Sequence, residues 1–264
     1  MADLTGMTAI ISGGVGDIGI AIARAVGNAG AAVAIGDVHE QIDAAEALER
    51  VTQEGVRVRY DRVDVTQPDA VSDWVAAVKA DLGVPQLVIP NAAIVNAIDI
   101  LDITPDAWQR EVAVNLHGAF YLAQTCAKQL IAANLPGRMV FVGSWAAHSA
   151  HANLPAYCAT KAALRMLCQT FALRLAQHDI LVNEIAPGFV DGGLSARLYR
   201  ENPELRTQTR EWVPIRKLIT TREVAQQVVQ LCDLSNQHIT GSTLVMDGGL
   251  SLTRVSNFLD AEGT

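Results

Sequence analysis

The chain has little of what marks disulfide-rich, metal-binding or nucleic-acid-binding proteins. It contains 4 cysteines in 264 residues. None of them forms a CxxC pair or stands at zinc-ligand spacing from a histidine, so we expect buried free thiols and no metal site. Acidic residues outnumber basic residues by 28 to 20, and a net charge of -8 repels a phosphate backbone. Nucleic acid is therefore not an expected partner.

Long apolar runs and internal boundaries are absent too. No apolar stretch is long enough to cross a bilayer, and the first residues, MADLTGMTAII, lack the pattern of a secretory signal. We therefore expect a cytoplasmic protein that does not associate with membranes. No Pro/Ser-rich linker, charge run or repeat divides the chain. With 50% of its residues hydrophobic, the chain can bury a large core, so residues 1–264 are expected to form a single domain.

What is present is a regular alternation of short β-rich apolar runs with longer segments of helical period. This alternation predicts an α/β fold, a Rossmann-type doubly wound parallel sheet of seven strands with helices on both faces. The expected strands are residues 7–12, 32–37, 56–61, 86–90, 138–143, 180–186 and 242–246.

Helix starts and one long exception stand out between these strands. Thr66 and Thr104 each come shortly before a proline, which predicts a capping side chain at the start of a helix. Segment 191–220 is long and mixed in character, and it precedes the last helix and strand. Such a segment in a compact fold is usually functional, so we expect a loop or lid over the substrate.

A glycine-rich turn follows the first strand. The sequence Ser12-Gly13-Gly14-Val15-Gly16-Asp17-Ile18-Gly19 opens a helix of small residues, where backbone N–H groups and the positive helix end can bind a pyrophosphate. Asp37 ends the second strand, where a carboxylate can accept hydrogen bonds from both hydroxyls of an adenosine ribose. Together they favour a dinucleotide site over a turn that binds nothing.

A second group of residues indicates chemistry. Tyr157 and Lys161 lie one turn apart on a predicted helix, and a nearby ammonium stabilises a phenolate, which brings the phenol toward working range as a base. Ser144 follows a buried strand at its carboxyl end, where ligands bind in open α/β sheets. Asn115 is a poor choice inside a helix and indicates a kink or a bound water.

In this order the residues resemble the short-chain dehydrogenase/reductase family over about the whole chain. The shared features are the glycine turn, Asp37, Asp64-Val65, Asn91-Ala92-Ala93, Asn115, Ser144, Tyr157-x-x-x-Lys161, Pro187-Gly188 and ITGSTLVMDGG near the end. The resemblance is to the shorter-chain branch with its Tyr-x-x-x-Lys active site.

The resemblance implies a role for each residue. Tyr157 would be the general acid/base, Ser144 would orient the substrate, Lys161 would lower the tyrosine pKa and hold the nicotinamide ribose, and Asn115 would hold a relay water. Asp64 would take the adenine amino group, with Val65 against the ring. The catalytic set is thus Asn115, Ser144, Tyr157 and Lys161. The cofactor-binding set is Ser12, Gly13, Gly16, Asp17, Ile18, Gly19, Asp37, Asp64, Val65, Asn91, Ala92, Tyr157, Lys161, Pro187, Gly188 and Val190.

Two positions depart from that family. Asp17 stands where the shorter branch has a glycine, and Gly13, Gly16 and Gly19 then show the three-residue spacing of the extended branch, which includes epimerases and dehydratases without net redox. Since Asp17 places a carboxylate beside the expected pyrophosphate, we expect it to cap the following helix. Gly192 replaces a common threonine whose hydroxyl holds the nicotinamide carboxamide, so Gly192-Gly193 is a candidate hinge.

The expected function is an NAD-dependent oxidoreductase acting on a secondary alcohol or carbonyl, with NAD favoured over NADP because Asp37 would repel a 2′-phosphate. Alternatives are a non-catalytic NAD-binding sensor or scaffold, and epimerase- or dehydratase-like chemistry. The residues expected near the substrate, namely Asn96, His148, His151 and Asn153, are more polar than a steroid or fatty-acyl pocket needs. They favour a small polar alcohol such as a polyol or sugar, and the alternative is that they are solvated loop residues. The helices predicted around 105–133 and 153–178 are expected to build a homotetramer or homodimer.

Overall fold

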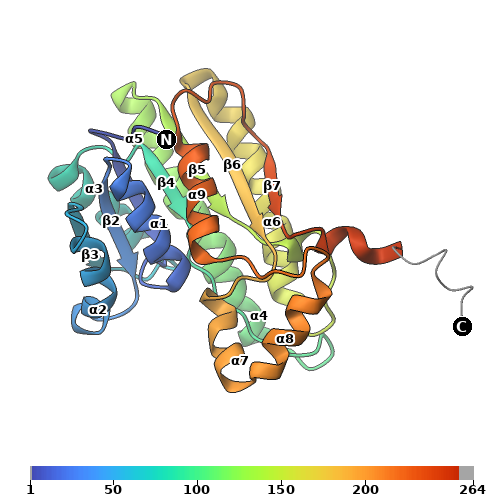
Figure 1. Cartoon of the computed structure of the whole chain (residues 1–264). Coiled ribbons are helices and arrows are strands. Elements are labelled where there is room, and N and C mark those ends of the chain that lie inside the picture. The colour runs from blue at the N-terminus through green and yellow to red at the C-terminus, as the bar shows by residue number, and fades with distance from the viewer. Residues whose placement is uncertain (1, 256–264) are drawn as a thin grey trace, which may run out of the picture.

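The computed structural model describes residues 2–255 and contains one seven-stranded sheet (Figure 1). All neighbouring strands are parallel, in the order β3-β2-β1-β4-β5-β6-β7. The predicted Rossmann-type fold is confirmed. The strands are β1 (Thr8–Ser12), β2 (Ala32–Asp37), β3 (Val58–Arg62), β4 (Leu87–Pro90), β5 (Gly137–Val142), β6 (Ile180–Pro187) and β7 (Thr243–Met246).

Helices cover both faces of this sheet. One core joins the sheet to α3, α5 and α6, and a second core joins its other face to α1, α2 and α9. The helices are α1 (Asp17–Asn28), α2 (Gln41–Thr52), α3 (Pro68–Leu82), α4 (Pro105–Val112), α5 (Ala119–Ala133), α6 (Pro155–Leu175), α7 (Ala196–Glu201), α8 (Pro203–Trp212) and α9 (Thr221–Cys232). Within residues 2–255, no helix is both long enough and apolar enough to span a membrane.

The predicted strand boundaries agree with the structure to within a residue, except at the start of β3. β3 begins two residues later than expected, since its register with β2 runs from Val58 opposite Val33 to Arg62 opposite Asp37. Thr104 caps α4 by accepting the N–H of Ala107 at 3.2 Å, as predicted. The same prediction for Thr66 is wrong, because α3 begins one residue later, after Gln67, without a side-chain cap.

The predicted helix over 105–133 is interrupted at its middle. Between α4 and α5 the chain forms a π-helical turn, η1 (Ala113–Gly118), which contains Asn115. π-turns inside α-helices frequently mark functional sites. At the asparagine for which a kink or a bound water was expected, the helix thus has a widened turn.

Segment 191–220 is an insertion after β6 whose two ends lie side by side. Its two ends are joined by backbone bonds, from Asp191 N–H to the Ile219 carbonyl at 2.7 Å and from Ile219 N–H to the Phe189 carbonyl at 2.9 Å. Between them lie the short helices α7 and α8, which project beyond the carboxyl ends of the strands (Figure 1). The segment is thus positioned at the end of the sheet where ligands bind in this fold.

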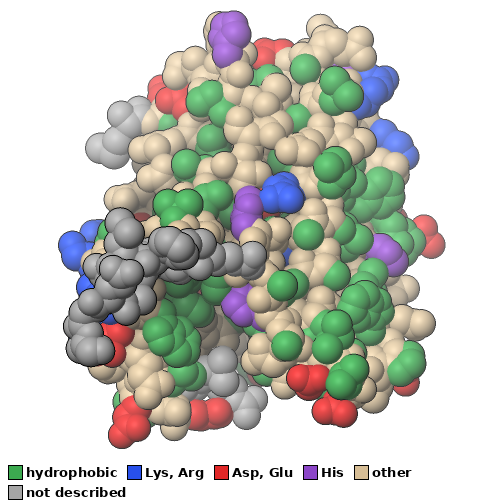
Figure 2. Space-filling model, turned by 90° about the vertical axis from the view of Figure 1, so that its right-hand side faces the viewer, with side chains coloured by type: hydrophobic (Ala, Val, Ile, Leu, Met, Phe, Trp, Pro, Cys, Tyr) green, Lys and Arg blue, Asp and Glu red, His purple; other side chains and the backbone are tan. Residues whose placement is uncertain are grey.

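Apolar side chains remain exposed along one side of the molecule. The edge strand β7 exposes Leu244 and Val245, and the outer side of α6 exposes Met166 and Leu173 by 60% and 86%. Figure 2 views the side on which β7 lies and shows hydrophobic side chains interspersed with polar ones. The cysteines form no disulfide, and three of them are buried while Cys158 is partly buried.

Candidate active site

The glycine turn is held against the neighbouring strand ends. Ser12 is buried, and its Oγ accepts the N–H groups of Asn91 at 3.1 Å and Ala92 at 3.2 Å. The Asn91 side-chain amide donates to the carbonyls of Ser12 and Gly13. Gly13 has a φ of +63° and lies so close to β4 that a Cβ there would be 2.6 Å from the Ala92 Cα. Only glycine fits this approach.

The start of α1 fits an anionic group. Gly16 is the N-cap residue and supplies no side-chain hydrogen bond, so the first N–H groups of the helix are left without a capping side chain. A Cβ added at Gly19 would lie 2.5 Å from the Gly13 carbonyl oxygen, so the turn and the helix pack backbone to backbone. Uncapped donors at the positive end of a helix are the donor set that binds pyrophosphate.

Asp17 does not have the capping role predicted for it. It is the first residue of α1, after the N-cap, and its Oδ2 accepts the N–H of Gly193 at 3.0 Å. Its carboxylate therefore ties the glycine turn to segment 191–220. Gly192, at φ +154° and ψ -171°, has a conformation found almost only in glycine, and a Cβ there would lie 2.7 Å from Thr221 Cγ2. A threonine at 192 is incompatible with this backbone.

Asp37 faces the same turn from the end of β2. Its Oδ2 accepts the Val15 N–H at 3.2 Å and its Oδ1 accepts the Val38 N–H at 2.8 Å. His39 lies 3.8 Å from Oδ1. Arg62, the residue opposite Asp37 on β3, donates to the Val38 carbonyl and pairs with Glu40. Sequence reasoning missed this cation, because only strand pairing brings it beside Asp37.

Ser144, Tyr157 and Lys161 converge at the carboxyl end of β5. Ser144 directly follows Gly143 at the strand end and is nearly buried, while Tyr157 and Lys161 lie on the first turns of α6. The Lys161 Nζ is 5.6 Å from the centre of the Tyr157 ring and donates to the Val142 carbonyl at 2.8 Å. The predicted one-turn spacing therefore brings the two side chains to one face.

Burial is the largest influence on the pKa values of Tyr157 and Lys161. Burial raises the pKa of Tyr157 to about 12, although a hydrogen bond with Ser144 lowers it. Burial also lowers the pKa of Lys161 to about 8, while the Glu184 carboxylate raises it. In the protein alone the tyrosine pKa thus lies above its ordinary value, opposite to the direction expected from a neighbouring ammonium.

Asn115 is buried and links three elements. Its Oδ1 accepts the Ile94 N–H at 2.8 Å, and its Nδ2 donates to the Ile94 carbonyl at 2.9 Å and to Thr160 Oγ1 at 3.3 Å. Thr160 directly precedes Lys161 on α6. The π-turn therefore positions Asn115 between the chain after β4 and the helix that carries Tyr157 and Lys161.

A cavity of about 500 Å³ gathers most of the predicted site. Ser12 and Asn115 are the predicted residues that do not line it. Ser12 supports its wall from behind, and Asn115 lies against α6. The predicted site residues that line it are Gly13, Gly16, Asp17, Ile18, Gly19, Asp37, Asp64, Val65, Asn91, Ala92, Ser144, Tyr157, Lys161, Pro187, Gly188 and Val190.

The polar residues expected near a substrate are placed otherwise. Asn96, His148, His151 and Asn153 do not belong to the lining of this cavity as far as the structure describes it. The Asn96 amide donates to Glu111 Oε1 at 2.9 Å, and His148 Nδ1 contacts Arg165 at 2.9 Å. Glu111, fully buried, was not singled out from the sequence, where it looks like an ordinary helix-surface acid.

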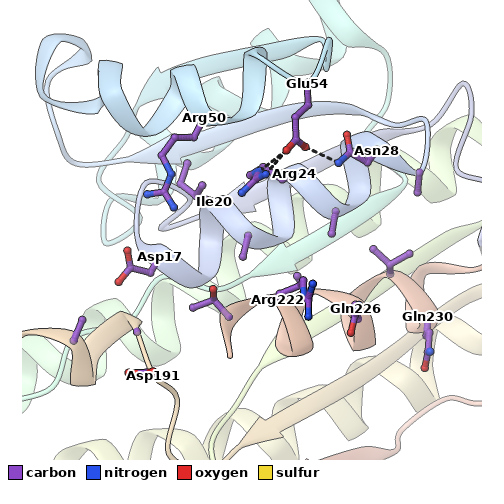
Figure 3. Close-up of a pocket in the computed structure, with 18 of the residues that line it drawn as sticks. Asp17, Ile20, Arg24, Asn28, Arg50, Glu54, Asp191, Arg222, Gln226 and Gln230 are labelled. Atoms are coloured by element: carbon purple, nitrogen blue, oxygen red, sulfur yellow. Dashed lines mark hydrogen bonds and ion pairs between the residues drawn. The ribbon is translucent and has the colours of Figure 1, made fainter. Parts of the chain in front are cut away.

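A larger hollow of about 1270 Å³ lies between α1, α9 and segment 191–220, away from Ser144, Tyr157 and Lys161. Figure 3 shows Arg24 and Asn28 bonded to Glu54 on one side of it and Arg222 on α9 across from them. Asp17 and Gly192 belong to the walls of both cavities. Ser144, Tyr157 and Lys161 line the smaller cavity and not the larger one, so the smaller cavity is the candidate active site.

Comparison with known proteins agrees with this geometry. Residues 14–251 match a family model described as enoyl-(acyl carrier protein) reductase. The chain is 32% identical over 254 residues to sorbitol dehydrogenase of Cereibacter sphaeroides, covering 93% of this chain and 98% of that protein. It is 30% identical to L-rhamnose 1-dehydrogenase (NAD(P)(+)) of Sphingomonas sp. (strain SKA58), covering 94% and 97% of the two chains.

Among solved structures, NAD+-bound xylitol dehydrogenase superposes with a TM-score of 0.86 at 29% identity, covering 93% of this chain and 99% of that one. The chain belongs to the short-chain dehydrogenase/reductase family. It is an oxidoreductase of the kind that includes sugar-alcohol dehydrogenases, and the family binds a nicotinamide cofactor.

Proposed function

We propose that the protein is an NAD-dependent dehydrogenase of a small polar alcohol, oxidising a secondary alcohol to a ketone or running the reverse reaction. The observation that carries the proposal is the convergence of Ser144, Tyr157 and Lys161 in the same cavity as the glycine turn and Asp37. When bound, NAD would supply the hydride acceptor and a positive charge that lowers the pKa of the phenol.

The protein's own groups divide the remaining work. The Ser144 hydroxyl holds the substrate oxygen, and Tyr157 takes the hydroxyl proton in oxidation and returns it in reduction. The ammonium of Lys161 binds ribose hydroxyls and favours the phenolate. Asn115 positions the chain around the relay through its bonds to Ile94 and Thr160.

NAD is proposed over NADP on the position of Asp37. Its carboxylate reaches the cavity at the end of β2, where an unmodified ribose can donate to it. The names of related proteins include both NAD and NADP. The choice between the two cofactors in this chain must therefore be argued from its own residues. The Asp37 charge opposes a 2′-phosphate, and Arg62, the nearest cation on β3, is already paired with Glu40 at 3.0 Å.

The substrate class rests on the relatives and on the site. Sorbitol and xylitol dehydrogenases are similar over nearly the whole chain, which favours a polyol or sugar. Trp145 and Phe189 follow Ser144 and Gly188 directly in the chain, and their ring centres lie 5.3 Å apart. We further propose that the chain is a single cytoplasmic domain assembled as a homotetramer or homodimer.

The test is turnover measured by the NADH absorbance band, with sugar alcohols and simple secondary alcohols as substrates. Tyr157→Phe should lower kcat by at least about a thousandfold while leaving NADH affinity within a few-fold, because it removes the proton carrier and little else. Tyr121→Phe on α5, outside the cavity, is the matched control and should keep full activity. Tight NAD binding with no turnover on a broad panel would instead indicate a non-catalytic sensor.

A further inference from the structure

Glu184 is a buried carboxylate that no part of the proposed reaction uses. It lies in the middle of β6 and is fully buried. Its Oε2 accepts the Thr243 hydroxyl from β7 at 2.7 Å, whereas its Oε1 has no hydrogen-bond partner among the described residues. A buried charge with one oxygen unsatisfied is costly to keep, so its presence calls for a second interaction.

The unpartnered oxygen lies beside the strand end that carries the active serine. A Cβ added at Gly143 would fall 1.9 Å from Glu184 Oε1 and 2.7 Å from its carboxyl carbon. The carboxylate therefore occupies the space that any side chain at 143 would need. Gly143 immediately precedes Ser144, and its N–H donates to the Ile185 carbonyl at 2.7 Å, which fixes the two strands at this point.

Lys161 approaches the same piece of β5. Its ammonium, only 2% exposed, donates to the carbonyl of Val142, the residue before Gly143. Two buried groups of opposite charge thus flank Val142 and Gly143. At low local dielectric such charges interact strongly even without a direct hydrogen bond.

The other charged neighbours are few. Burial raises the pKa of Glu184, while the Thr243 hydroxyl and the charges of Lys161 and Arg165 on α6 lower it in part. The Cys168 thiol on that helix is itself affected by Glu184. From β7 the carboxylate meets the neutral Thr243, and from β5 the glycine. Burial lowers the pKa of Lys161, and the Glu184 carboxylate raises it in part.

We propose that Glu184 is a positioning residue of the active centre, which keeps Lys161 in its protonated form across the gap left by Gly143. The proposal rests on the proposed function for its importance, since that function needs an ammonium at Lys161. It also explains why position 143 is glycine. Without the carboxylate, a buried lysine loses its proton at lower pH, and its hold on ribose hydroxyls weakens with it.

The direct test is the titration of Lys161 in the free protein. The chain's lysines are Lys79, Lys128, Lys161 and Lys217, so carbon-13 labelling of the lysine Cε gives a simple NMR spectrum, with Lys161 identified by the loss of its signal in Lys161→Arg. Exposed lysines titrate near pH ~10.4. The Lys161 midpoint is expected near pH 8.

Glu184→Gln should lower that midpoint by about one pH unit, because it removes the opposite charge and keeps the shape. Glu46→Gln, an exposed acid on α2, is the matched control and should leave the midpoint unchanged. Thr243→Val should move the midpoint in the same direction by less, since it removes the bond that favours the carboxylate, and it decides the matter if Glu184→Gln does not fold. An unchanged Lys161 midpoint in the folded variants overturns the proposal.

A second readout separates this inference from the proposed function. If Lys161 binds the ribose as an ammonium, NADH affinity of Glu184→Gln at pH 8 should be about fivefold weaker than that of the unaltered protein, and the two should converge below about pH 6. Equal affinity at every pH contradicts the inference. A shifted Lys161 midpoint in a protein without dehydrogenase activity keeps the inference and refutes the proposed function.

Discussion

We expect Asp37 to set the preference for NAD over NADP, so its replacement should remove most of that preference. The Asp37 side chain is 12% exposed. One carboxylate oxygen accepts a backbone N–H of the glycine turn, and the other accepts the N–H of the residue that follows β2. Two like charges about 4 Å apart repel by about 4 kcal/mol at an effective dielectric near ~20. Screening at the rim of the cavity and the nearby Arg62 reduce this, so we expect ~3 kcal/mol, or about a hundredfold in kcat/KM in favour of NAD.

The perturbation is best made in two forms. Asp37→Asn keeps the acceptor for the Val15 N–H and removes the charge, so the NAD to NADP ratio should fall by about tenfold or more with the turn intact. Asp37→Ala should narrow the ratio further and also weaken NAD itself. Adding Arg62→Ala to either variant should then lower kcat/KM for NADP more than for NAD, because Arg62 stands opposite position 37 on β3 and bonds to the Val38 carbonyl.

The assay is kcat/KM for both cofactors at pH 7.5 and one fixed ionic strength, since the effect is electrostatic. Affinities of NADH and NADPH by fluorescence give the binding part separately. Comparable kcat/KM for the two cofactors in the unaltered protein, or an unchanged ratio in Asp37→Asn, would refute this account of Asp37.

Four further outcomes are expected. Asp17→Ala should speed hydrogen exchange at Gly193 by about tenfold, because it removes that amide's acceptor, and exchange across 191–220 should slow when NAD and substrate bind, which mass spectrometry can follow. Arg138→Met should lower the free energy of unfolding in urea by about 3 kcal/mol, since the buried guanidinium donates to four backbone carbonyls. Light scattering at micromolar concentration should give a dimeric or tetrameric mass, and a monomeric mass would contradict the proposed assembly.

The fold could be predicted because its signals are local. The strands are short runs rich in apolar residues, and most helices repeat their apolar positions within a few turns, so the alternation of the two patterns indicated the parallel sheet. Asn115 is a single residue that gave such a local signal. Its poor fit to a helix interior indicated an irregularity, and the structure has a π-turn there.

Long-range contacts could not be predicted in the same way. Asp17 looked like a helix cap, but its partner is an amide 176 residues away, which no local pattern reveals. Glu184 and Glu111 look like solvated acids in sequence and are fully buried in the fold. Only the pairing of β6 with β5 on one side and with β7 on the other places Glu184 between Gly143 and Thr243. The sequence was enough to predict which residues form the site, whereas the charged partners of those residues could be identified only from the folded sheet.

The strand order has a consequence for synthesis of the chain. After β1, β2 and β3 have formed, every later strand joins the same growing edge in the order in which it leaves the ribosome, from β4 to β7. The nucleotide-binding half can therefore assemble while the catalytic half is still being translated. Until residue 243 emerges, β6 is an open edge, and its Glu184 carboxylate lacks the hydroxyl that holds it. A nascent chain paused at that point would expose an apolar strand edge with a charge in its middle, and that charge disfavours pairing with a neighbouring chain.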